Sequence, residues 1–224
     1  MKKNYLGQLA HLKETILRMG GLTEQMVHRA VQALVERRPE MLDEVRNLEA
    51  QVNQLNIEID DQCVQLIALQ QPAGRDVRFI SAAMKINANL ERIGDQAINI
   101  TEQAESLLSV PPLKPLIDIP RMAEIAKEML KDSLDAFVNG DAEQARVTIA
   151  RDDLVDNLKD QIFRELLTYM MGDARTIPRA MDLILISRHL ERIADHATNI
   201  GEDVIYMIKG QSIKHHCDDR SPKI

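Results

Sequence analysis

The sequence predicts an all-α protein built from two tandem, pseudo-symmetric three-helix bundles with six long helices. Apolar residues recur at three- and four-residue steps along most of the chain, which is typical of amphipathic helices. The core must be aliphatic, because the 224 residues include only three Phe, three Tyr and no Trp. An 11-residue segment also occurs twice, at 90–100 and at 190–200, with eight identical positions. Unrelated segments would share about one position, so the chain contains an internal duplication.

Three helices are expected in the first half. The first covers about residues 5–36, and its Gly20-Gly21 pair indicates a kink or a close helix crossing. Pro39 then opens a helix that lasts to about residue 71. A Gln-Pro-Ala-Gly turn precedes a third helix, which carries the first copy of the repeat and fades near Ser109. Short turns make consecutive helices antiparallel neighbours, which predicts a three-helix bundle.

The second half repeats this order after a proline-rich linker. Prolines at 111, 112 and 115 stiffen the connection. Helices are then expected from Pro120 to about Val138, from about Ala142 to Met171, and after Pro178, where the second copy lies. The expected division is a first bundle at 1–109, a linker at 110–119, a second bundle at 120–210 and a polar tail at 211–224.

Composition excludes several functional classes. A net charge of −7 argues against binding to nucleic acid or directly to an anionic membrane surface. No segment approaches the roughly 18 apolar residues that a membrane span requires. Cys63 and Cys217 are too far apart to indicate a disulfide framework or a zinc motif. A reducing, cytoplasmic location is therefore expected.

Each copy of the repeat carries an acidic stripe. Glu91, Asp95 and Asn99 are four residues apart, so they share a helix face that points away from Leu90 and Ile93. The corresponding residues of the second copy are Glu191, Asp195 and Asn199. Two explanations remain open. The acids form surface ion pairs with the arginine between them, or they line an oxygen-rich site for Mg²⁺, Mn²⁺ or iron.

A facing wall is expected from the helix that precedes each repeat helix. Asp152 and Asp156 lie one turn apart, and alignment of the two halves places Glu49 and Asn53 at the matching positions. Four carboxylates that met in the bundle would repel one another without a cation. The alternative is that these acids remain solvated and never converge. The candidate metal ligands are therefore Glu49, Asn53, Glu91, Asp95, Asp152, Asp156, Glu191 and Asp195.

No residue pattern indicates catalysis or an organic cofactor. The chain lacks the Glu-x-x-His pairs of di-iron bundles. It also lacks a glycine-rich phosphate loop and a recognisable nucleophile–base arrangement. His189 and His196 lie seven residues apart beside the second acidic stripe, and we interpret them as surface histidines. We therefore expect neither catalytic nor cofactor-binding residues.

The ordered motifs resemble those of the PhoU family over nearly the whole chain. They are Met19-Gly20-Gly21, Gln71-Pro72-Ala73-x-x-Asp76-Val77-Arg78, Leu90-Glu91-Arg92-Ile93-Gly94-Asp95, the segment from Thr168 to Pro178, and Glu191-Arg192-Ile193-x-Asp195. The resemblance implies tandem three-helix bundles in a cytoplasmic, homodimeric protein that is peripheral to the inner membrane through its partners. It also implies metal ions (magnesium, manganese, iron or zinc) on E/D-x-x-x-D motifs, with Asn53 as a departure.

The resemblance further implies a non-catalytic adaptor that negatively regulates phosphate uptake and the phosphate-starvation response. Its implied partners are the ATPase subunit of a phosphate ABC transporter and a phosphate-sensing histidine kinase. Two alternatives stay open: a metal-dependent phosphohydrolase that uses the same carboxylates, and a purely structural bundle.

Overall fold

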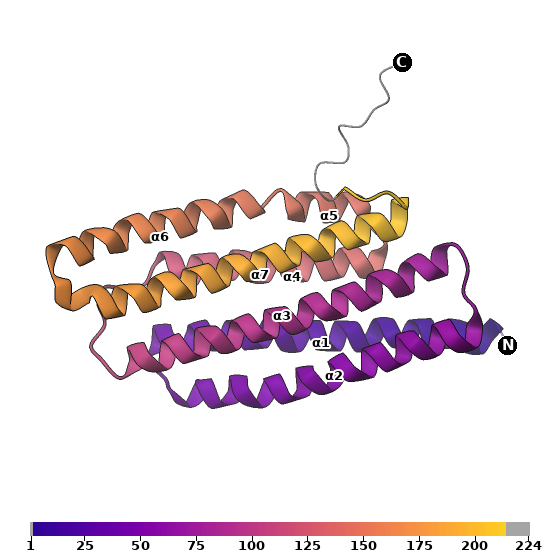
Figure 1. Cartoon of the computed structure of the whole chain (residues 1–224), viewed down its shortest axis with the longest axis horizontal. Coiled ribbons are helices and arrows are strands. Elements are labelled where there is room, and N and C mark those ends of the chain that lie inside the picture. Colours follow the sequence, from indigo (N-terminus) through magenta and orange to yellow (C-terminus); the bar gives the residue numbers. More distant parts are fainter. Residues whose placement is uncertain (1, 214–224) are drawn as a thin grey trace, which may run out of the picture.

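The computed structural model describes residues 2–213, and its regular secondary structure in that range is entirely helical. The helices form two stacked bundles that lie along a common long direction (Figure 1). The predicted all-α architecture of two tandem three-helix bundles is confirmed. The expected polar tail begins after Gly210, but its residues 214–224 lie outside the described part of the chain, as does Cys217.

Helices α1, α2 and α3 form the first bundle. Their bounds are Lys2–Glu36, Glu40–Gln70 and Arg75–Leu108. Each of the two turns contains a non-glycine residue in the left-handed region, Arg37 at φ 55° and Gln71 at φ 47°. This conformation ends each helix abruptly, so the next helix returns alongside the previous one.

The second bundle follows a non-helical segment and contains one more break than expected. It comprises α4 (Asp118–Asn139), α5 (Ala142–Ile149), α6 (Asp152–Gly172), the short 3₁₀ helix η1 (Ala174–Thr176) and α7 (Ile177–Lys209). The expected helix from Ala142 to Met171 is thus divided at Ala150 and Arg151. Arg151 reaches back to α4, where Nη1 donates to Asp132 Oδ2 at 2.8 Å and Nη2 contacts Glu128.

Helices α3 and α7 form the central seam of the molecule. They run antiparallel, side by side, and their contact is the most extensive of any helix pair (Figure 1). The apolar stripe of each repeat is fully buried, as its spacing predicted. Its members are Leu90, Ile93, Ala97 and Ile100 in α3 and Leu190, Ile193, Ala197 and Ile200 in α7. Each bundle therefore contributes its copy of the repeat both to its own core and to the junction with the other bundle.

The glycine pair in α1 marks a close helix crossing. Helix α1 is continuous through Gly20 and Gly21. A Cβ atom on Gly20 would lie only 2.3 Å from Cδ1 of Leu134 on α4, whereas one on Gly21 would meet nothing within 4 Å. Gly20 therefore allows α1 of the first bundle to approach α4 of the second.

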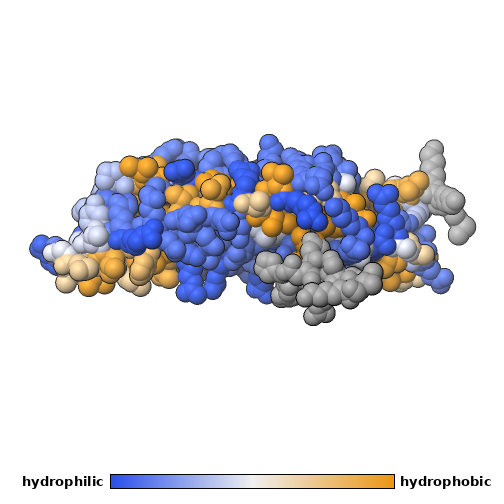
Figure 2. Space-filling model, turned by 90° about the horizontal axis from the view of Figure 1, so that it is seen from above, coloured by the Kyte–Doolittle hydropathy of each residue, from blue (hydrophilic) through white to orange (hydrophobic). Residues whose placement is uncertain are grey.

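The surface is mostly hydrophilic, with apolar patches between the charged areas, on the face shown in Figure 2. Within residues 2–213, no helix has the length and apolar character needed to cross a membrane.

Candidate functional site

The two acidic walls of the second bundle meet across α6 and α7. Lys159 on α6 connects them, because its Nζ donates to Asp156 Oδ1 at 2.8 Å and to Glu191 Oε1 at 3.0 Å. Asp156 lies on the same helix as Lys159, and Glu191 lies on α7. The expected approach of these walls is therefore found in this half. We call Asp152, Asp156, Glu191 and Asp195 the second-half acidic patch.

The pKa values within the patch reflect this crowding. Desolvation raises the pKa of Asp195 to about 6, and repulsion by Glu191, Asp152 and Asp156 adds to the increase. Asp195 is nevertheless exposed, so solvent screens part of this repulsion. The pKa of Asp152 is also raised, first by desolvation and then by Asp156. Glu191 and Asp156 thus contribute, after desolvation, to the raised pKa of both Asp152 and Asp195.

Lys159 is the internal counter-ion of this patch. Its hydrogen bond to Asp156 is the largest cause that raises its pKa, and its bond to Glu191 contributes further. The ammonium group therefore stays charged at neutral pH. One of the two explanations left open by the sequence gives this neutralising role to the arginine within the repeat. In the second copy, a lysine from the facing helix performs it instead.

The first bundle does not reproduce this arrangement. Arg92 on α3 contacts both acids of its stripe, with Nη1 3.2 Å from Asp95 Oδ2 and Nε 3.5 Å from Glu91 Oε2. This is the surface ion pair that the first explanation predicted. Desolvation and Asp95 raise the pKa of Glu91, which Arg92 partly offsets. Within the described residues, no hydrogen bond or ion pair connects Glu49 or Asn53 of α2 with these acids.

The fit of the candidate ligands to a metal ion is partial. Carboxylate oxygens suit hard cations, and the second-half acidic patch supplies four carboxylates from two facing helices. In residues 2–213, however, no three Asp, Glu, His or Cys side chains are grouped closely enough to hold one ion. Lys159 occupies the position between Asp156 and Glu191. Metal binding by the eight candidate residues therefore stays a prediction.

Two histidines form polar contacts that the sequence interpretation missed. His189 Nδ1 lies 2.9 Å from Gln96 Oε1, and His196 Nδ1 lies 3.0 Å from Asn89 Oδ1. Both contacts link α7 to α3, so the interpretation as surface histidines is wrong. Burial lowers the pKa of each imidazole, and nearby arginines lower it further. The sequence did contain a signal for these contacts, because His189 and His196 occupy the positions that Asn89 and Gln96 occupy in the first copy of the repeat.

Comparison with known proteins agrees with this duplicated architecture. The family model described as "PhoU domain" matches residues 16–104 and again residues 119–204. A relative from Aquifex aeolicus (strain VF5), named "Phosphate-specific transport system accessory protein PhoU homolog", is 42% identical over 208 residues. The match covers 93% of this chain and 94% of that relative.

Two solved structures share the fold. The crystal structure of PhoU from Pseudomonas aeruginosa is 36% identical, with a TM-score of 0.89, over 92% of this chain and 100% of that one. The phosphate transport system regulatory protein PhoU from Streptococcus pneumoniae is 27% identical, with a TM-score of 0.85, over 94% and 99%. With two matched domains, close relatives over nearly its full length and the same helical architecture, the chain belongs to the PhoU family.

Proposed function

We propose that this chain is a non-catalytic regulatory adaptor of phosphate homeostasis, an accessory protein of a phosphate-specific transport system. The observation that carries the proposal is the 42% identity, over more than nine-tenths of both chains, to a relative named as such an accessory protein. The Streptococcus pneumoniae relative is named a regulatory protein of phosphate transport. Neither name denotes an enzyme, which agrees with the residue-based expectation of a non-catalytic protein.

The finer proposal is that the protein restrains phosphate uptake and the starvation response. It would do so by contacting the ATPase subunit of a phosphate ABC transporter and a sensor histidine kinase. It would work as a homodimer on the cytoplasmic side of the inner membrane, attached through these partners. Two observations support a binding role. Helices α2 and α6 lie on the outside of the two bundles (Figure 1), and they expose large apolar side chains, including Ile57, Val64 and Phe163 at 57%, 57% and 48%.

Capture of partners from cells tests the adaptor role. The full-length protein, cross-linked in phosphate-replete cells, should recover the transporter ATPase or the sensor kinase. Ile57→Lys or Phe163→Lys should reduce recovery of at least one partner, because a charge then interrupts an apolar contact. Val147→Lys on α5 is a matched control, since Val147 is 67% exposed. Recovery of neither partner, together with normal repression of alkaline phosphatase in a deletion strain under high phosphate, would refute the adaptor function.

We also propose that the second-half acidic patch binds a hard cation more tightly than the first-half acids do. The support is the raised pKa of Asp152 and Asp195, which is caused first by desolvation and then by repulsion from the neighbouring carboxylates. Because Lys159 already neutralises part of this charge, Lys159→Met should tighten Mn²⁺ binding, measured by calorimetry on untagged protein. Asp195→Asn should weaken it, whereas Asp95→Asn in the first bundle serves as the matched control. Equal Mn²⁺ affinity in all of these variants would contradict the assignment.

A metal-dependent phosphohydrolase is the second candidate function. The observation that favours it is the pKa of Asp195, raised to about 6, because general acid–base catalysis requires a group that titrates near the working pH. Phosphate-ester turnover by purified protein with Mn²⁺, lost in Asp195→Asn and kept in Asp95→Asn, would establish this activity. Absence of turnover under those conditions would leave the adaptor as the better account.

A further inference from the structure

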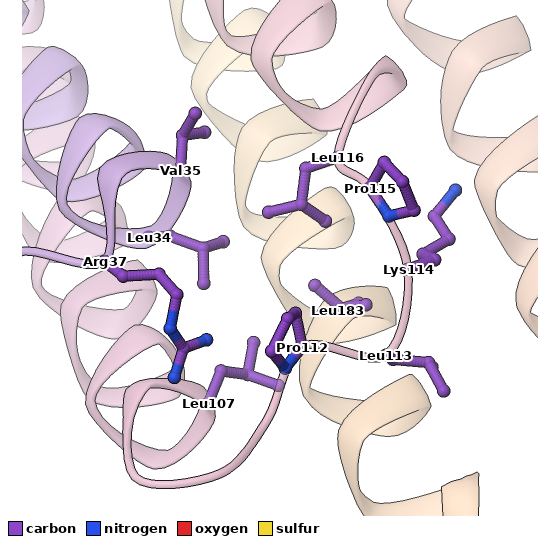
Figure 3. Close-up of a pocket in the computed structure, with 10 residues that line it drawn as sticks. All are labelled: Leu34, Val35, Arg37, Leu107, Pro112, Leu113, Lys114, Pro115, Leu116 and Leu183. Carbon is purple, nitrogen blue, oxygen red and sulfur yellow. The ribbon is translucent and has the colours of Figure 1, made fainter.

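A cavity of about 570 Å³ lies where the two bundles and their connecting segment meet. Its walls come from the ends of α1 and α3, the segment between α3 and α4, and the beginning of α7 (Figure 3). The lining residues are Leu34, Val35, Arg37, Leu107, Pro112, Leu113, Lys114, Pro115, Leu116 and Leu183. Cavities that bind small molecules usually measure about 300–1,000 Å³, so this one has a suitable size.

The interior of this junction cavity is apolar. Leu34, Leu107 and Leu183 belong to three different helices and are at most 6% exposed. Leu116 extends from the connecting segment toward them (Figure 3). No carboxylate is present among the lining residues. The cavity therefore favours an apolar group, and none of its lining side chains carries a negative charge that would repel an anion.

Arg37 supplies a fixed positive charge at the side of the cavity. Its Nη2 donates to the carbonyl oxygens of Leu108 at 2.8 Å and Val110 at 2.7 Å, which holds the guanidinium against the end of α3. Both N–H groups of Nη2 are thereby used, and Nε and Nη1 remain for another acceptor. Across the described part of the chain, no carboxylate forms an ion pair with Arg37.

The other cation of the lining is already neutralised. Lys114 forms an ion pair with Glu165 of α6, and its side chain points away from the cavity (Figure 3). Arg37 also holds its left-handed backbone conformation at φ 55° without being glycine. Such strain persists where the surrounding contacts fix the residue. The junction cavity thus combines apolar walls with one oriented guanidinium that has no carboxylate partner among the described residues.

We propose that the junction cavity binds a small amphipathic anion, such as a medium-chain fatty carboxylate, with its tail against the leucines and its carboxylate on Arg37. Guanidinium binds carboxylate through charge-assisted hydrogen bonds, and the tail removes apolar surface from water. The ligand would contact both bundles and the segment between them. Its binding would therefore stabilise their junction.

Calorimetry with decanoate and decanol tests this proposal. The wild-type chain should bind one decanoate, below the concentration at which decanoate forms micelles, and bind the neutral alcohol more weakly. Arg37→Met should weaken decanoate binding by roughly 3- to 10-fold, because the charged hydrogen bonds are lost but solvent screens the exposed guanidinium, and it should leave decanol binding unchanged. Arg38→Met is the matched control. Arg38 is the neighbouring residue, but its guanidinium pairs with Glu36 and Glu40 outside the cavity.

Leucine methyl resonances locate the ligand independently. Decanoate should shift the methyl signals of Leu107, Leu116 and Leu183. It should leave those of Leu12 unchanged, because Leu12 is buried in the N-terminal part of α1, away from the cavity. Leu116→Trp should abolish binding of both ligands by filling the cavity, while thermal melting confirms that the variant is folded. Absence of saturable decanoate binding, or equal weakening by Arg37→Met and Arg38→Met, would overturn the proposal.

Discussion

The two adjacent glycines of α1 should respond to alanine substitution with opposite signs. At Gly20 the new Cβ would lie 2.3 Å from Leu134 Cδ1, so this leucine, which is only 3% exposed, must move within a packed core. Overpacking of this kind costs about 1–3 kcal/mol, and the better helix propensity of alanine returns at most about 1 kcal/mol. Gly20→Ala should therefore lower the free energy of unfolding by about 1–2 kcal/mol.

Gly21→Ala is the matched control, because its Cβ would meet nothing within 4 Å. It should gain up to about 1 kcal/mol from helix propensity. For a chain of this size, 1 kcal/mol corresponds to about 2–4 °C in Tm, so differential scanning calorimetry resolves the two variants. In the Gly20→Ala background, Leu134→Ala should cost less than it does in the wild type, since it removes the clashing methyl group. A Tm for Gly20→Ala at or above that of Gly21→Ala would refute the close-crossing explanation.

Three further predictions concern groups away from the acidic patch. Lys85 Nζ lies 3.3 Å from the fully buried Asp203, so Lys85→Met should cost about 2 kcal/mol in urea unfolding, allowing for the exposure of Lys85. Adding Asp203→Asn should recover part of that loss. Burial raises the pKa of the Cys63 thiol to about 12, which leaves about one thiolate in ten thousand at pH 8. In a variant without the other cysteine, iodoacetamide should therefore label the unfolded chain rapidly and the folded chain very slowly. Burial also raises the pKa of Glu24, so the folded state favours the protonated carboxyl and ionisation opposes folding as pH rises. Glu24→Gln should stabilise the protein at about pH 7 and have little effect at about pH 4, where the carboxyl is protonated in both states; equal stabilisation at both values would contradict this sign.

The sequence predicted those features that depend on local pattern. The apolar positions of both repeats are buried because a helix places residues three and four apart on one face. Helix ends near Pro39 and Gly140 were also predictable, since proline and a left-handed glycine act on their own neighbours. The features that were missed depend on contacts between distant segments. The break between α5 and α6 lies where Arg151 meets two acids of α4, and no local pattern contains that information.

In the candidate site, too, local spacing was predictable and contacts between distant segments were not. Spacing alone placed Glu191 and Asp195 on one stripe and predicted that α6 would face it. It did not show that Lys159 lies between the two helices, because a lysine three residues after Asp156 also fits an ordinary surface position. The junction cavity was likewise unpredictable, since its walls come from four segments that are far apart in the sequence.

The contact between α3 and α7 has a consequence for how such a chain could arise. The two histidine–amide contacts are equivalent under the internal repeat. His189 contacts Gln96, and the residues equivalent to these two in the other copy, Asn89 and His196, contact each other in the same way. An unduplicated ancestor with one bundle would have presented the same helix face to an identical subunit, as in an isologous dimer. In this chain the two sides differ, because one carries Asn89 and Gln96 where the other carries His189 and His196. The α3–α7 contact thus has, within one chain, the geometry of an isologous interface between two identical subunits.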